Sequence, residues 1–405
     1  MNLKLFRLHS LLGQDPESKK MNDSIINDIN DALLKEDIYL TEDADDDELS
    51  VVFVETGGSE EPFLKIADKV SNPCILVTTY RDNSLPACLE IKTYLESKHI
   101  MAIIYDADSN NLSVDMFIDL AKVYKAKHEL KGARLGVVGK PSDWLIASKV
   151  DYSKVKEKFG IDLIDISIEE FQKEIDKKTY GRVKHLAELK KKWKDEEVLE
   201  GALHIYGALK RLIIRYDLEG LTVRCFDLLG LYKNTSCLAF ALLNEEGYIA
   251  TCEGDVPSML TMVILNKISG FSSFQANPSY ISYKNQEVLF AHCTIPLDMC
   301  NSFELDTHFE SGLGIGIKGV LSESEVSVCK LAPDLKSWIS CEGKISENPS
   351  LKGYCRTQIR VKFERESFLD FLSTSVGNHV IISYNPLIAR LFSLFLASFQ
   401  DKEKE

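Results

Sequence analysis

Short apolar runs recur at near-regular spacing through the first 170 residues of the chain, and this pattern constrains the fold more than any other feature. The runs lie at residues 50–54, 73–78, 101–105, 134–139 and 161–165, with helical patterns at 85–98 and 114–130 between them. Continuous apolar runs that alternate with helices are typical of parallel sheets, whose strands are buried on both faces and joined by crossover helices. We therefore predict one or two Rossmann-like layers in a first region, residues 1–170.

A second region, residues 171–285, begins near the point where the composition shifts toward charged helix formers. We predict that residues 167–199 form a connecting helix, because a run that carries both signs of charge is typical of a solvated helix face. A helical pattern at 203–216 and a strand pattern at 221–227 follow. This region is expected to hold connecting helices and an α/β catalytic segment.

The third region, residues 286–405, is rich in short strand patterns separated by turn residues. These patterns lie at 288–293, 312–319, 324–330, 338–342 and 357–363. A series of short strands like this predicts a barrel or a sandwich. The expected fold class is therefore α/β: a Rossmann-like parallel-sheet region followed by a mixed α+β domain with a β-barrel-like part.

Length, charge and cysteine usage narrow the kinds of protein that the chain can be. At 405 residues it exceeds what one hydrophobic core usually serves. Its formal net charge of -14 argues against nucleic acid or an anionic membrane surface as a partner. No apolar run reaches the ~18 residues of a membrane span, and the ten cysteines form no C-x-x-C pair, which favours reduced, buried thiols. We expect a cytoplasmic protein without a secretory leader, whose partner is a small molecule.

The Thr-Cys-Glu-Gly-Asp segment at residues 251–255 leaves a strand-like run and enters a helix that begins near Pro257, a residue suited to the first helical turn. Asp255 is thus expected to be the N-cap of that helix. Glu253 would then stand at the strand end and face a cleft. In the plainer alternative, both residues are ordinary cap and surface acids.

Three more candidate ligands follow along the chain. Asn277 lies in a Phe-Gln-Ala-Asn segment, His292 in an apolar strand pattern, and His379 just ahead of another strand pattern. Together with Glu253 they would supply one carboxylate, one amide and two imidazoles, which suits an open divalent-metal site. His292 could equally be a hydrogen-bonded core residue.

The order and local sequence of these four residues resemble the C-terminal catalytic domain of the L-fucose isomerase and L-arabinose isomerase families. In those families a Glu from an E-x-D or E-G-D segment, a second carboxylate from an F-x-D-like segment and a later histidine hold a divalent metal, usually manganese. The resemblance makes Glu253, Asn277, His292 and His379 the expected metal ligands and Mn²⁺ the expected cofactor. Asn277 departs from the pattern, because it stands where those families have a carboxylate. Without that charge, the affinity for a hard divalent ion should fall.

The resemblance implies a fucose isomerase-like aldose-ketose isomerase, which moves a proton between C1 and C2 of an open-chain sugar or sugar derivative through an ene-diol. Glu253 would be both ligand and base, and Asp255, His292, His308 or Glu310 would supply the second proton transfer. A homo-oligomer, trimer or hexamer, is implied as well. Two alternatives stay open: a non-catalytic sugar-binding or sensor protein that keeps the fold, and a metal-dependent aldolase or epimerase with the same first proton abstraction.

His308 and Glu310 belong to an acid-rich segment, residues 303–312, that also contains Glu304 and Asp306. In a strand these four side chains would share one face, which either meets water or lines a site. The glycine-rich turn that follows favours His308 and Glu310 as the site members.

Four further candidates for substrate binding lie near predicted strand ends. Arg224, Asp227 and Arg356 could bind sugar hydroxyls or a substrate carboxylate or phosphate, or could equally form structural ion pairs. Trp144 follows a predicted strand at the kind of edge where open α/β sheets bind ligands. Its ring could stack on a sugar or pack at a domain interface.

Overall fold

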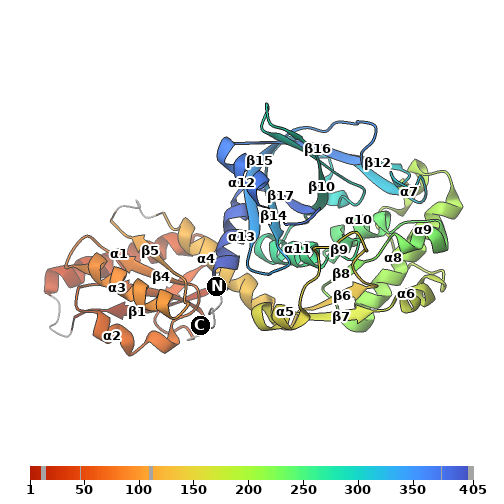
Figure 1. The fold of residues 1–405 in the computed structure, drawn as a ribbon. Helices are drawn as coiled ribbons and strands as arrows, with labels where there is room; N and C mark the ends of the chain where they lie inside the picture. The colour runs from red at the N-terminus through yellow and green to blue at the C-terminus, as the bar shows by residue number, and fades with distance from the viewer. Residues whose placement is uncertain (11–14, 46, 109–112, 375, 400–405) are drawn as a thin grey trace. The chain divides into compact units, whose positions relative to one another are not determined.

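The computed structural model of the protein describes residues 1–10, 15–45, 47–108, 113–374 and 376–399. The chain forms two compact units, one of residues 1–125 with the segment that starts at 394, and one of residues 126–393. Each unit contains a parallel sheet with helices packed on it, and the second unit also contains a barrel (Figure 1). The predicted fold class is confirmed.

The sheet of the first unit has five parallel strands in the order β2-β1-β3-β4-β5. All six residues of the central strand β3 are buried, as expected of a strand covered on both faces. One apolar core includes Ile29 and Phe117, and the other includes Phe63 and Ile91. The elements are β1 (Asn2–Leu8), α1 (Pro16–Leu34), β2 (Tyr39–Thr41), β3 (Leu49–Val54), α2 (Glu60–Leu64), the 3-10 turn η1 (Ala67–Lys69), β4 (Cys74–Thr78), α3 (Ser84–Ser97), β5 (Ala102–Asp106) and the start of α4 (Asp115–Glu129).

The parallel sheet of the second unit has the order β7-β6-β8-β9. Its elements are β6 (Arg134–Val138), α5 (Tyr152–Phe159), β7 (Asp162–Ile166), α6 (Ile168–Ile175), α7 (Leu186–Lys192), α8 (Glu196–Tyr216), β8 (Gly220–Val223), α9 (Asp227–Tyr232), α10 (Cys237–Glu245), β9 (Ile249–Cys252) and α11 (Val256–Ser269). The predicted division at residue 170 thus falls between strands of a single sheet.

Six antiparallel strands close into a barrel in the order β10-β11-β16-β15-β14-β17. Residues of the barrel and of the parallel sheet, such as Phe290 and Leu221, belong to one continuous apolar core. The remaining elements are β10 (Phe274–Ser282), β11 (Glu287–His292), the 3-10 turn η2 (Leu297–Met299), β12 (Ser302–Asp306), β13 (Gly316–Val320), β14 (Glu325–Leu331), β15 (Trp338–Glu347), β16 (Thr357–Phe363), α12 (Arg365–Ser373), β17 (Val380–Tyr384) and α13 (Leu387–Ala397).

The prediction of one connecting helix over residues 167–199 is wrong. The segment contains α6, α7 and the start of α8, each with its own beginning. Ser167 caps α6 by accepting a hydrogen bond from the Glu170 N–H at 3.1 Å, and Asp195 caps α8 by accepting one from the Val198 N–H at 3.2 Å. Between α6 and α7 the backbone at Gly181 has φ +67°, which a helix cannot continue through. Charged composition did not reveal these boundaries.

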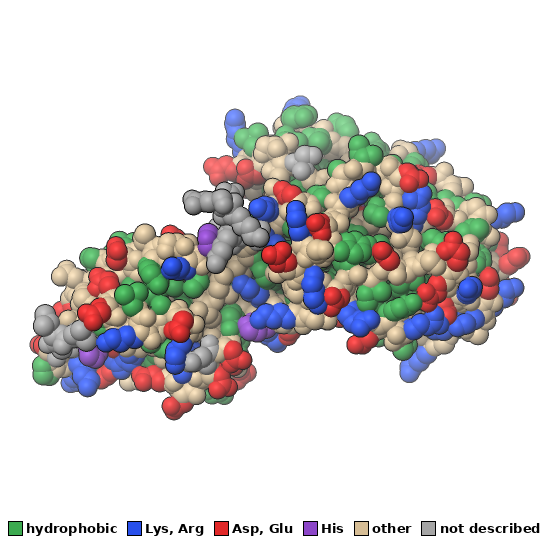
Figure 2. Space-filling model, turned by 60° about the horizontal axis from the view of Figure 1, so that its bottom comes forward, with side chains coloured by type: hydrophobic (Ala, Val, Ile, Leu, Met, Phe, Trp, Pro, Cys, Tyr) green, Lys and Arg blue, Asp and Glu red, His purple; other side chains and the backbone are tan. Residues whose placement is uncertain are grey.

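Charges of both signs are interspersed over the face of the protein drawn in Figure 2. Within the described ranges, no helix combines the length and the apolar character that crossing a bilayer requires.

A buried carboxylate links α6 to α8. Glu174 is 2% exposed, and it accepts hydrogen bonds from Lys177 Nζ and Arg211 Nε, both at 2.7 Å, and from Arg215. Burial alone would raise the pKa of Glu174, but the three cations outweigh burial and lower its pKa to about 2. The ionised form is therefore strongly favoured in the folded protein.

Glu174→Gln should lower the free energy of unfolding at pH 7 by about 2 kcal/mol, less than for a fully buried pair because Lys177 and Arg215 are partly exposed. The folded pKa lies below the ordinary value of 4.5, so the carboxylate stabilises fully above that value and loses its effect as the pH falls toward 2. Urea titrations at pH 7 and pH 3 should show the difference between the two proteins shrinking. The exposed Glu157→Gln is the control, and an undiminished difference at pH 3 would contradict the prediction.

Candidate active site

A cavity of about 460 Å³ opens in the second unit, between the parallel sheet and the barrel. Residues that follow β6, β8 and β9 form one side of it. The other side comes from β10, from the end of β11 and from the loops before β13, β16 and β17. The carboxyl ends of parallel strands are where open α/β sheets usually bind ligands.

Glu253 reaches the cavity from a sharp turn between β9 and α11. It has φ +66°, a left-handed conformation that costs a residue with a side chain roughly 1–2 kcal/mol. Gly254 follows at φ +71°, and a Cβ there would lie 2.7 Å from the carbonyl oxygen of Lys140. Only glycine therefore fits this close approach, which brings Glu253 beside the loop that follows β6.

Glu253 is 8% exposed, and its carboxylate has two polar neighbours. Trp144 Nε1 donates a hydrogen bond to Oε2 at 2.7 Å, and His379 Nε2 lies 3.7 Å from Oε1. Burial would raise the pKa of Glu253, but His379 and Trp144 outweigh burial and lower it to about 2. The carboxylate is therefore ionised at neutral pH, although little water reaches it.

Asp255 caps α11 as predicted, accepting a hydrogen bond from the Ser258 N–H at 3.0 Å. Its other oxygen accepts hydrogen bonds from Lys330 Nζ at 2.9 Å and from His379 Nδ1 at 2.8 Å. Asp255, Lys330 and His379 are all at most 1% exposed. Burial opposes the charge of Asp255, but Lys330 and His379 lower its pKa well below the usual range. Neither Asp255 nor His379 lines the cavity. The Asp255 carboxylate holds the His379 imidazole so that its Nε2 lies toward Glu253.

Asn277 and His292 both line the cavity, on the neighbouring strands β10 and β11. A β-bulge between Pro278 and Tyr280 interrupts the pairing next to Asn277, and bulges often re-aim side chains beside active sites. His292 contacts Thr294 Oγ1 through Nδ1 at 2.8 Å, which leaves Nε2 for a ligand. Burial first, and then the charge of His379, lowers the pKa of His292 to about 3, so that the ring is neutral.

His308 and Glu310 line the cavity, but they do not extend a strand. The predicted polar row is wrong, because β12 ends at Asp306 and both residues lie in the loop before β13. The buried His308 ring contacts Ser311 Oγ through Nδ1 at 3.0 Å. Burial, reinforced by Arg356, lowers the pKa of His308, whereas burial and the charge of Glu253 raise that of Glu310.

Trp144 is the one of the four predicted substrate-binding residues that lines the cavity. It is 51% exposed and packs edge to face on Phe226, with ring centroids 4.9 Å apart. Arg224 instead forms ion pairs with Asp143 at 2.7 Å and Asp227 at 3.1 Å, which fastens the loop that carries Trp144.

Arg356 also lies outside the lining. Its guanidinium donates to the Thr307 carbonyl oxygen at 2.6 Å and pairs with Asp306 at 3.3 Å. These contacts secure the loop that holds His308 and Glu310.

The donor atoms around Glu253 fit a metal ion. One donor atom each from Cys252, Glu253 and His292 lies within 4.8 Å of the other two. In addition, His379 Nε2 is buried without a hydrogen-bond partner among the described residues. Cys252 was not predicted as a donor, although it directly precedes Glu253. Lys330 was not predicted either, because nothing near it in the sequence indicates its buried partner.

Comparisons with known proteins find sugar isomerases at low identity. No protein-family model matches the chain. The chain is 22% identical over 191 residues to sulfoquinovose isomerase of Alkalicoccus urumqiensis, covering 43% of this chain and 41% of that protein. It is 26% identical over 186 residues to sulfoquinovose isomerase of Priestia megaterium, covering 44% and 40%. For sulfoquinovose isomerase of Clostridium sp. (strain MSTE9) the identity is 23% over 212 residues, covering 49% and 45%. The matched stretches therefore span less than half of each relative.

Proposed function

We propose that the protein is an aldose-ketose isomerase that acts on a sugar or sugar derivative bound in the cavity beside Glu253. The main support is the set of ionisable groups at that cavity. A buried carboxylate, held ionised in a strained turn, faces the same space as two neutral imidazoles, those of His292 and His308, and the Glu310 carboxyl. The similarity to proteins named sulfoquinovose isomerase supports the same reaction class.

Cys252, Glu253 and His292 would hold a divalent ion, with Asn277 as a further oxygen donor on the cavity wall. When bound, such an ion polarises neighbouring sugar oxygens and stabilises the negative charge of an ene-diolate. Mn²⁺ is the ion that the resemblance to the fucose and arabinose isomerases implies.

Proton transfer between C1 and C2 needs groups that gain and lose protons near neutral pH. Glu253 is a weak base because its pKa is lowered to about 2. The raised pKa of Glu310 and the neutral ring of His308 suit that role better. We therefore assign proton transfer to Glu310 and His308, and charge stabilisation to Glu253. Trp144 would both hold Glu253 and present its ring to the sugar.

Sulfoquinovose, a sulfonated hexose, is the first substrate to test, followed by pentoses, hexoses and deoxyhexoses. We further propose a cytoplasmic homo-oligomer, a trimer or hexamer, which equilibrium sedimentation would identify.

The deciding experiment is proton-deuterium exchange at C1 and C2 of each sugar in D₂O, followed by NMR with added Mn²⁺ or Zn²⁺ and with EDTA. Exchange that depends on a metal supports isomerase chemistry. Exchange at a carbon other than C1 or C2 would favour an epimerase or aldolase. If the protein binds one of the sugars but catalyses no exchange with any of them, it is a non-catalytic sugar-binding protein.

That second candidate is favoured by Asn277, a neutral residue on the wall beside Glu253. Asn277→Asp should raise metal affinity about tenfold or more if the site is a metal-dependent isomerase, because divalent ions prefer carboxylate oxygens. Isothermal titration with Mn²⁺ would measure this, with the exposed Asn285→Asp as the matched control. Equal affinities in all three proteins would favour the non-catalytic alternative.

A further inference from the structure

The sulfur of Cys252 is part of the donor cluster beside Glu253. Cys252 is 4% exposed and lines the cavity, and its Sγ, a Glu253 oxygen and a His292 nitrogen lie within 4.8 Å of one another. All three residues are buried, so no layer of bulk water separates the donors. Cys252 and His292 are the last residues of β9 and β11 and are held by sheet pairing, and Glu253 directly follows Cys252 in the turn before α11.

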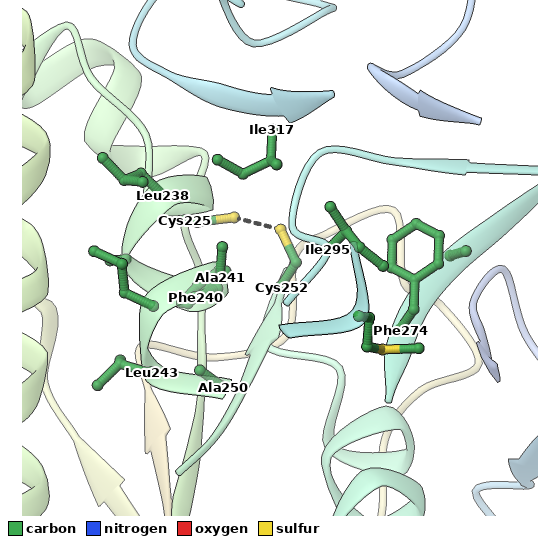
Figure 3. Packing of buried hydrophobic residues seen from close by; sticks show 14 of the residues in the cluster. Cys225, Leu238, Phe240, Ala241, Leu243, Ala250, Cys252, Phe274, Ile295 and Ile317 are labelled. Atoms are coloured by element: carbon green, nitrogen blue, oxygen red, sulfur yellow. Dashed lines mark hydrogen bonds between the residues drawn. The ribbon is translucent and has the colours of Figure 1, made fainter. Parts of the chain in front are cut away.

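The backbone around the thiol is well anchored. The Cys252 N–H donates to Gln275 Oε1 at 2.8 Å, which ties the end of β9 to β10. The sulfurs of Cys225 and Cys252 point toward one another at 2.9 Å (Figure 3). Cys225 lies outside the donor cluster and does not line the cavity. Cys252 is thus the candidate ligand, and the neighbouring thiol of Cys225 serves as the control for mutation.

The types of donor determine which metal the cluster suits. Hard ions such as Mn²⁺ and Mg²⁺ favour carboxylate, carbonyl and water oxygens, whereas a thiolate with an imidazole favours Zn²⁺. Glu253 supplies the cluster's carboxylate, and the nearby Asn277 supplies only a neutral amide. A thiolate from Cys252 would add the second negative charge that Asn277 lacks.

We infer that Cys252 is a metal ligand together with Glu253 and His292, and that this set of sulfur, oxygen and nitrogen donors selects Zn²⁺ over Mn²⁺. This inference deepens the proposed function, since it names the ion that the same cavity would use. Binding converts the thiol of Cys252 to a thiolate and releases its proton to solvent, without any change of oxidation state.

Cobalt substitution tests the inference without an activity assay. Metal-free protein is titrated with Co²⁺ under anaerobic conditions, and its near-ultraviolet absorption is recorded. The expected result is a thiolate-to-cobalt charge-transfer band that Zn²⁺ removes by competition, while an equal concentration of Mn²⁺ leaves it in place. Cys252→Ser should lose the band and weaken Zn²⁺ binding by about tenfold or more. Cys225→Ser should keep both.

Four results would overturn the inference: no metal binding, Co²⁺ binding without the band, a band retained in Cys252→Ser, or displacement by Mn²⁺ as effective as by Zn²⁺. A band lost only in Cys225→Ser would assign the thiol ligand to Cys225 instead.

Circular dichroism of each variant separates misfolding from loss of a ligand. Glu253→Gln keeps both thiols, so it should weaken cobalt binding but retain a band at high Co²⁺. The sugar-exchange assay is independent. A charge-transfer band without sugar exchange would reject the isomerase activity but support the metal site. Sugar exchange without a band would support the isomerase activity but reject Cys252 as a metal ligand.

Discussion

Glu253→Gln should reduce metal-dependent exchange at C1 and C2 of the sugar by about 10²–10⁴-fold, the range seen when a positioned catalytic group is lost. The amide keeps the size of the side chain and an oxygen that can accept the Trp144 hydrogen bond. It removes the negative charge that His379 and Trp144 keep on this side chain. NMR in D₂O at saturating metal measures the change, so that weaker metal binding does not mask it.

The control for Glu253→Gln is Glu304→Gln. Glu304 is an exposed carboxylate of the second unit that lies outside the cavity lining, and its side chain is 72% exposed. Sugar exchange by the Glu304→Gln variant should be as fast as by the unaltered protein. A Glu253→Gln protein that exchanges within a few fold of the unaltered one would remove Glu253 from the chemistry. Glu310 and His308, to which proton transfer is assigned, would then act without charge stabilisation by Glu253.

Much of the fold could be predicted from the sequence because its strands are continuous apolar runs. Strands β3 to β7 lie within a residue or two of the predicted runs. In β3 and β4 every position is buried, so no exposed position interrupts the apolar pattern. Strand β1 was missed because its buried residues Leu3 and Leu5 alternate with polar or half-buried ones. Strand β10 was missed because Pro278 interrupts it, and the bulge beside that proline is what makes it tolerable.

The candidate site could be predicted only in part. Glu253, Asn277, His292, His308, Glu310 and Trp144 do meet at one cavity. The partners of Arg224 and Arg356 could not be predicted, because ion pairs with Asp143 and Asp306 depend on how loops fold back. The burial of Lys330 was equally hidden. A lysine at the end of a strand pattern is expected to face water, and the carboxylate that holds this one lies 75 positions away.

Asp255→Asn should lower the free energy of unfolding by about 3–5 kcal/mol, the second large effect that we expect. The variant leaves the ammonium group of Lys330, 1% exposed, without its anion. Because an amide has a single acceptor oxygen, it also cannot accept from both the Ser258 N–H and His379 Nδ1. Lys330→Met should cost less, about 2 kcal/mol, because Asp255 keeps its hydrogen bonds from Ser258 and His379. Urea denaturation of the second unit's transition would measure both.

The double variant Asp255→Asn/Lys330→Met should be more stable than Asp255→Asn alone, because it removes the buried charge that the single change strands. Stability losses that simply add would show that the pair is not coupled.

The same pair predicts a pH dependence of stability. Burial lowers the pKa of Lys330, and Asp255 opposes that shift. Without Asp255 the folded protein should release this proton at a lower pH than the unfolded chain does. The unfolding free energy of Asp255→Asn should therefore rise more steeply between pH 7 and pH 9 than that of the unaltered protein. Parallel pH profiles would mean that Lys330 had moved to water or found another anion.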